Sequence, residues 1–148
     1  MKLYLTSLCF AWVLSACQKE DINNTLNKSD NTNGIVLSET FNPDGQNLLL
    51  QGNFENAVHS TSGSVKIYED KDKKRTLVLE NLKTDAGPDL RIYLAEDKSL
   101  TNFIQITDKV QNGSVALQVP SDANLQKQNH VLIWCRKYSV LFGFAQMK

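Results

Sequence analysis

Histidine and cysteine are scarce in this chain, and several catalytic motifs are missing altogether. The sequence has two histidines and three cysteines, with no Cys-x-x-Cys pair, no glycine-rich phosphate loop and no Ser-His-Asp pattern with local support. A closed zinc site takes four such ligands, so no metal site is expected. The sequence therefore gives no support to hydrolytic or group-transfer catalysis.

An excess of charge of either sign is also missing. Sixteen basic residues balance sixteen acidic ones, so the chain as a whole has no net attraction for nucleic acid or for an anionic membrane surface. No nucleic-acid partner is expected.

Only the N-terminus carries a long hydrophobic run. Lys2 precedes an almost wholly apolar run over residues 3–14. This run is shorter than the roughly 20 residues that a helix needs to span a bilayer. Its length is that of the apolar segment of a signal peptide.

The motif Leu14-Ser15-Ala16-Cys17 follows this run directly and resembles the lipobox of bacterial lipoproteins. The resemblance implies cleavage before Cys17 and attachment of diacylglycerol to its sulfur, with further acylation by chains such as palmitate. We therefore expect residues 1–16 to be a lipoprotein signal peptide and the lipid on Cys17 to bind a membrane. An ordinary signal peptide with an incidental Cys17 is the alternative.

The next four residues, Gln18-Lys19-Glu20-Asp21, resemble the Lys-acidic-acidic signal that directs some Gram-negative lipoproteins to the outer face of the outer membrane. The resemblance implies an outer-membrane lipoprotein of the cell envelope, either surface-exposed or facing the periplasm. Residues 17–33 are rich in asparagine and other polar residues, with Ile22 and Leu26 as their only large apolar side chains. Such a segment buries too little surface to offset its ordering entropy, so we expect a flexible tether.

Residues 34–148 carry the pattern of an all-β domain. Short runs rich in β-branched and aromatic residues alternate with turn signals, at residues 48–50, 65–68, 76–79, 90–94, 103–106, 115–119, 130–135 and 140–145. No stretch keeps a helical period over a dozen residues, and residues 121–128 suggest one helical turn at most. Eight or nine short strands without intervening helices predict a single β-sandwich or jelly roll.

One cysteine is left in the predicted domain after Cys9 is removed and Cys17 is lipidated. In the run 130–135, alternation places Val131, Ile133 and Cys135 on one face of a strand. If this face points into the core, Cys135 is a small buried hydrophobe. If it does not, Cys135 is an unpaired thiol in an oxidising compartment, free to react or to ligate.

A resemblance to a known family rests on residues between Gly52 and Ala145. These are Gly52-Asn53-Phe54, His59, Ser62-Gly63-Ser64-Val65, Leu77, Leu79, Asn81-Leu82, Gly87-Pro88-Asp89-Leu90, Tyr93-Leu94, Val131-Leu132-Ile133-Trp134-Cys135 and Val140-Leu141-Phe142-Gly143-Phe144-Ala145. Together they resemble the DM-thirteen domain, also called the electron-transfer DM domain. Leu82 departs from the family pattern, where an aromatic residue is usual.

The resemblance implies a β-sandwich module of extracytoplasmic proteins that accompanies DOMON and b-type cytochrome domains. It also implies redox chemistry at Cys135, or a role for its thiolate as a haem or metal ligand, with a redox partner protein. Haem is the cofactor that this reading suggests.

Three further residues are candidate cofactor contacts. His59 matches the family and would form a His–Cys ligand pair with Cys135 if the fold brings the two together. The alternative is a solvent-exposed loop histidine. Asp89 would line a pocket rim, or bond the amides of its own turn. Trp134 would stack on a cofactor, or pack beside the core.

Two functional hypotheses follow. The first is a membrane-anchored redox or haem-binding module that acts through Cys135. The second is a non-catalytic binding or structural module of the cell envelope, in which Cys135 is a buried core residue.

Overall fold

The structure, a computed structural model, describes residues 41–148. These residues form nine β-strands and no α-helix. The strands are β1 (Asn47–Asn53), β2 (Glu55–Asn56), β3 (Thr61–Glu69), β4 (Arg75–Thr84), β5 (Leu90–Ala95), β6 (Ile104–Thr107), β7 (Gly113–Val119), β8 (His130–Cys135) and β9 (Val140–Gln146). No helix in this part of the chain has the length and hydropathy that a membrane span requires.

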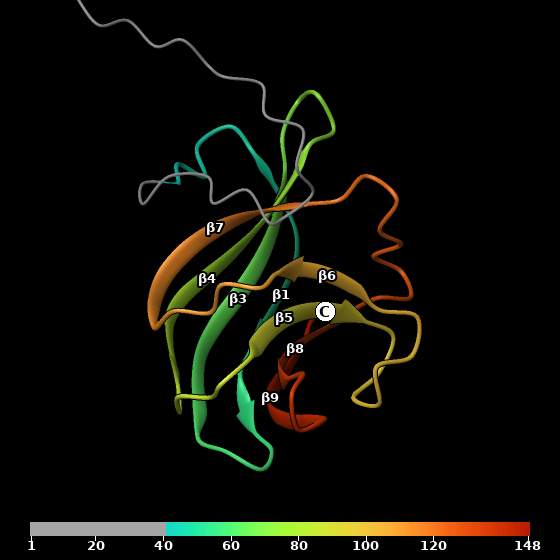
Figure 1. Cartoon of the computed structure of the whole chain (residues 1–148). Coiled ribbons are helices and arrows are strands. Elements are labelled where there is room, and N and C mark those ends of the chain that lie inside the picture. The colour runs from blue at the N-terminus through green and yellow to red at the C-terminus, as the bar shows by residue number, and fades with distance from the viewer. Residues whose placement is uncertain (1–40) are drawn as a thin grey trace, which may run out of the picture. The chain divides into compact units, whose positions relative to one another are not determined.

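The strands form two antiparallel sheets (Figure 1). One sheet has the order β1-β3-β4-β7 and the other β2-β9-β8-β5-β6. On one side of the molecule the sheets are joined by backbone hydrogen bonds in both directions between Gln51 and Lys148, at 3.1 and 3.0 Å. On the other side β6 and β7 are neighbours. The predicted all-β sandwich of eight or nine strands is confirmed.

The core between the sheets follows from alternation along the strands. In β8, for example, Val131, Ile133 and Cys135 point inward and are fully buried. The outer face of the same sheet carries a smaller apolar cluster of Tyr93, Ala95, Leu132 and Phe144, flanked by Leu100, Trp134 and Leu141. The β8 strand is therefore apolar on both faces, as its sequence predicts, and lies between β9 and β5.

The two sheets come unusually close where β9 meets the start of β3. A Cβ added at Gly143 would lie 2.3 Å from the Cβ and Oγ1 of Thr61. Thr61 itself is buried, and its hydroxyl contacts that of Thr84 at 3.3 Å. Only glycine leaves room for the threonine side chain at this point.

Several details differ from the sequence-based expectation, including longer β1 and β3 strands. The two-residue strand β2 was not predicted, because two residues carry no periodic pattern. The β4 strand runs to Thr84, well beyond the predicted residues 76–79. Residues 121–128 form turns without a helix, although Gln128 N donates to Asn124 O at 2.7 Å. The predicted signal peptide, Cys17 and the tether lie outside the described residues.

Candidate functional site

Cys135 is the last residue of β8, and its side chain is sealed in the core. It is 0% exposed, and it is the free cysteine of the described residues. Its register partners are Leu90 on β5 and Val140 on β9, both of which pack against the main core cluster. Apolar side chains therefore occupy the space on both sides of the thiol.

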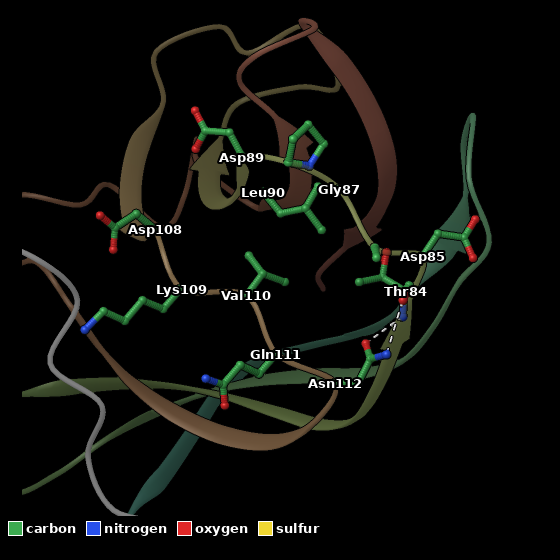
Figure 2. A pocket seen from close by; sticks show the side chains of 12 residues that line it. Thr84, Asp85, Gly87, Asp89, Leu90, Asp108, Lys109, Val110, Gln111 and Asn112 are labelled. Atoms are coloured by element: carbon green, nitrogen blue, oxygen red, sulfur yellow. Dashed lines mark hydrogen bonds between the residues drawn. The ribbon is translucent and has the colours of Figure 1, made fainter.

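A pocket of about 500 Å³ lies at the same end of the sandwich, between the β4–β5 and β6–β7 loops. Its lining residues are Thr84, Asp85, Ala86, Gly87, Pro88, Asp89, Leu90, Asp108, Lys109, Val110, Gln111 and Asn112. Figure 2 shows Leu90 and Val110 facing each other across it, with Asn112 bonded to the backbone of Thr84 at one side. Cys135 is not part of this lining, but its register partner Leu90 is.

The β4–β5 loop packs tightly against β5 and β9, the two strands that flank the strand with Cys135. A Cβ at Gly87 would lie 2.7 Å from Leu90 and 3.0 Å from the ring of Phe142. The backbone N of Arg136 donates to the carbonyl of Asp89 at 2.9 Å, which ties the loop to the residue that follows Cys135. This loop therefore forms the cover between the pocket and the core.

Asp89 lines the pocket, and its carboxylate is held by an arginine. Arg91 Nε donates to Asp89 Oδ1 at 2.6 Å, and Arg91 Nη1 lies 3.5 Å from Asp108 Oδ2. The hydrogen bond to Asp89 raises the pKa of the Arg91 guanidinium. The carboxylate of Asp89 is thus used in a local ion pair with Arg91 on β5, and Arg91 also reaches Asp108 just beyond β6. Of the two expectations from the sequence, Asp89 does line a pocket, but its carboxylate bonds to Arg91 in place of turn amides.

His59 lies in the β2–β3 loop with its ring held in place from two directions. Its Nδ1 is 3.2 Å from Asp85 Oδ2, an oxygen that also accepts the amide hydrogen of Ser60. The imidazole stacks on Phe142 with 3.8 Å between ring centroids. About a third of the His59 side chain is exposed. His59 is therefore a surface residue that contacts the core from outside.

Trp134 lies on the outer face of its sheet, opposite in direction to Cys135. It is half-buried and belongs to the outer apolar cluster with Leu132 and Phe144. Packing against the side chains of this outer apolar cluster accounts for its partial burial.

The four residues singled out from the sequence do not converge on one cavity. Cys135 is inside the core, His59 and Trp134 lie on different surfaces, and Asp89 lines the pocket. A haem ligated by Cys135 does not fit this packing, because iron would have to reach a thiol that has no exposed surface. Within residues 41–148 no three His, Cys, Asp or Glu side chains are grouped to hold a metal ion.

Sequence reasoning missed Asp85 and Arg91, the partners that fix His59 and Asp89. Asp85 is 26 residues from His59, and no local pattern links residues so far apart. Arg91 lies between Leu90 and Ile92, which both belong to or pack against the main core. Its two carboxylate partners lie just before β5 and just after β6.

The family model described as "Electron transfer DM13" matches residues 53–147, more than half of the chain. Searches of curated proteins and of solved structures found no match. The matched span covers all of β2 to β9 and includes Cys135, His59 and Asp89. The chain therefore belongs to the electron transfer DM13 family.

Proposed function

We propose that this protein is a membrane-anchored, extracytoplasmic lipoprotein whose DM13 domain is a non-catalytic module of an electron-transfer system. In this proposal Cys135 stabilises the fold and does not itself exchange electrons. The observation that supports it is the complete burial of the Cys135 side chain between the two sheets. A sulfur that contacts only packed side chains has no access to a partner's cofactor.

The anchor in this proposal is lipid on Cys17. Its support is the order of Lys2, the apolar run 3–14, and Leu14-Ser15-Ala16-Cys17. A lipidated chain would be held at a membrane of the cell envelope, within reach of redox proteins there. The outer membrane is the location that residues 18–21 favour, with the domain either surface-exposed or facing the periplasm.

The proposed role of Cys135 is tested by thiol titration of the folded protein. With lipid on the sulfur of Cys17, Cys135 is the only thiol of the mature chain. We expect no reaction with a thiol reagent until denaturant unfolds the domain, and no absorption band on addition of haem. Rapid native reaction, or a haem spectrum lost in Cys135→Ala, would contradict the proposal.

A second candidate function is thiol redox chemistry at Cys135, and one contact favours it. Leu90, the register partner of Cys135, lines the pocket, so a displacement of the β4–β5 loop would bring solvent toward the thiol. The thiol would then be oxidised only in an open state. A peroxide would convert it to a sulfenic acid and be reduced to water or an alcohol, or a disulfide of a partner would form a mixed disulfide with it and release one thiol.

The two candidates differ in how a local change affects the rate of thiol modification. If the loop opens locally, Asn112→Ala should speed native thiol modification without an equal loss of global stability, because Asn112 ties the β6–β7 loop to Thr84. If Cys135 is structural, modification should follow global unfolding only. A core substitution of similar cost, Ile133→Val, is the matched control.

A further inference from the structure

The most exposed large apolar side chains of the described residues lie on two loops at one end of the sandwich. Val58 is 71% exposed and Tyr138 is 62% exposed. Val58 belongs to the loop between β2 and β3, and Tyr138 to the turn between β8 and β9, both at the lower end of the molecule in Figure 1. The amide of Val58 donates to the carbonyl of Leu141 at 3.2 Å, which places the loop beside the strand that follows the turn.

Two cations accompany these side chains. Arg136 and Lys137 are exposed in the β8–β9 turn, and neither forms a salt bridge with another of the described residues. Lys137 Nζ lies 5.3 Å from the centroid of the Tyr138 ring. By contrast, Lys66 on β3 is paired with a carboxylate. Val58, Arg136, Lys137 and Tyr138 together are called the tip.

The composition of the tip is that of a surface that meets lipid headgroups. Tyrosine places an apolar ring and a polar hydroxyl at a membrane–water boundary, and long basic side chains keep their charge near anionic headgroups. Two cations that have no salt bridge within residues 41–148 lie next to two exposed apolar side chains, and this combination complements an anionic bilayer. This local charge exists although the whole chain is neutral.

We propose that the tip docks on the headgroup region of an anionic bilayer and so orients the domain on the membrane. The inference rests on the proposed lipid anchor at Cys17, which would keep the bilayer always within reach. A tethered surface needs only a weak intrinsic affinity, because the second contact is intramolecular.

The length of chain between anchor and domain permits this orientation. The ring of Phe41, the first described residue, lies 5.1 Å from that of Tyr68, at the end of β3 remote from the tip. The nine residues of β3 span about 30 Å. Residues 18–40 lie between Cys17 and Phe41, and a chain of that length reaches at most about 80 Å. That reach is more than twice the length of the strand, so the tip can turn toward the membrane.

Trp134 provides the readout. It is the one tryptophan that remains when residues 1–16 are removed, and it is the register partner of Leu141 beside the tip. The lipidated protein is reconstituted into vesicles with brominated acyl chains, made either of phosphatidylcholine alone or of phosphatidylcholine with phosphatidylglycerol. We expect quenching of Trp134 fluorescence in the anionic vesicles, and its loss at high salt.

Two pairs of substitutions test the tip itself. Arg136→Gln with Lys137→Gln should lower the ratio of docked to undocked protein about thirtyfold, since each basic residue near an anionic surface contributes roughly a factor of five. Val58→Ser with Tyr138→Ser should reduce quenching to its level in phosphatidylcholine. Circular dichroism checks that the variants remain folded, which the exposure of all four side chains favours.

The matched control removes two cations from the other end of the sandwich. Lys71 and Lys74 are exposed in the turn between β3 and β4, and Lys71→Gln with Lys74→Gln should leave quenching unchanged. An equal loss of Trp134 quenching in the control variant and in the tip variants would overturn the proposal. The absence of Trp134 quenching in anionic vesicles would overturn it too. If Trp134 of the native protein is not quenched and the tip variants lose binding to a protein partner, the tip is a protein-docking surface instead.

Failure of the anchor is distinguished from failure of the tip by mass spectrometry of Cys17. If Cys17 carries no lipid, the proposed anchoring fails on its own account. Docking is then measured by co-sedimentation of the full chain with the same vesicles. Binding that is the same with and without phosphatidylglycerol, and the same in the native protein and the tip variants, would refute the docking proposal.

Discussion

Replacement of Cys135 by serine tests the packing of this residue most directly. Serine keeps nearly the same shape but places a hydroxyl where the thiol has 0% exposure. The register partners Leu90 and Val140 are apolar, so the side chains that flank this position offer no acceptor. A buried hydroxyl without a partner costs about 1–3 kcal/mol.

Alanine at the same position gives a different balance. Cys135→Ala removes the sulfur and leaves a small cavity, with no polar group to desolvate. The lost transfer free energy and the cavity together cost about 1–2 kcal/mol. We therefore expect serine to destabilise the domain at least as much as alanine, although serine fills more of the space.

The assay is urea unfolding followed by circular dichroism, with thermal unfolding as a second measure. For a domain of about 100 residues, 1 kcal/mol lowers Tm by about 4–8 °C, so Cys135→Ser should lower Tm by roughly 5–20 °C. Ser60→Ala, at an exposed serine, is the control and should stay within about 0.5 kcal/mol of the native protein. A serine variant as stable as the native protein would refute the reasoning, because it would mean that the position is hydrated.

Three further predictions concern contacts away from Cys135. Gly143→Ala should cost about 1–3 kcal/mol in urea unfolding, because its Cβ would overlap Thr61; an unchanged midpoint would show that the sheets can separate there. The hydrogen bond from Lys66 lowers the pKa of Glu80 below its ordinary value of 4.5. This carboxylate therefore stabilises the fold fully above about pH 4.5, and the stabilisation is lost as the pH falls through the lower pKa of the folded state. Glu80→Gln should therefore flatten the fall in unfolding free energy in acid, and an unaltered pH profile would contradict the assignment. Asp97 accepts hydrogen bonds from its own loop, so Asp97→Ala should speed amide hydrogen exchange there, while equal rates in both proteins would count against this role.

The strands were largely predictable because alternation is a local signal. The pattern of β8 alone placed Val131, Ile133 and Cys135 on one face, and all three are fully buried. The same pattern placed Trp134 on the opposite face, where the structure has it. Alternation cannot reveal β2, whose two residues exist as a strand only because β9 lies beside them.

The surroundings of the candidate residues depended on contacts between distant parts of the chain. Nothing near His59 in sequence indicates Asp85 or the stacked ring of Phe142. Long-range pairing decides the contacts of His59, and sequence spacing does not encode it. The carboxylate of Asp89 is held by Arg91, only two residues along the chain; here the sequence left open whether the carboxylate would bond to this side chain or to the amides of its turn.

The hydrogen bonds between Gln51 and Lys148 restrict how the two sheets can move apart. Backbone hydrogen bonds hold the two sheets together on the side of Gln51 and Lys148. The sheets must therefore begin to separate on the other side, where β6 and β7 meet and where the β6–β7 loop borders the pocket. Fluctuations of the native protein should therefore be asymmetric, with slow amide exchange at Gln51 and Lys148 and faster exchange at residues 109–111. A small molecule or oxidant that reaches the core would enter between β6 and β7, beside the pocket.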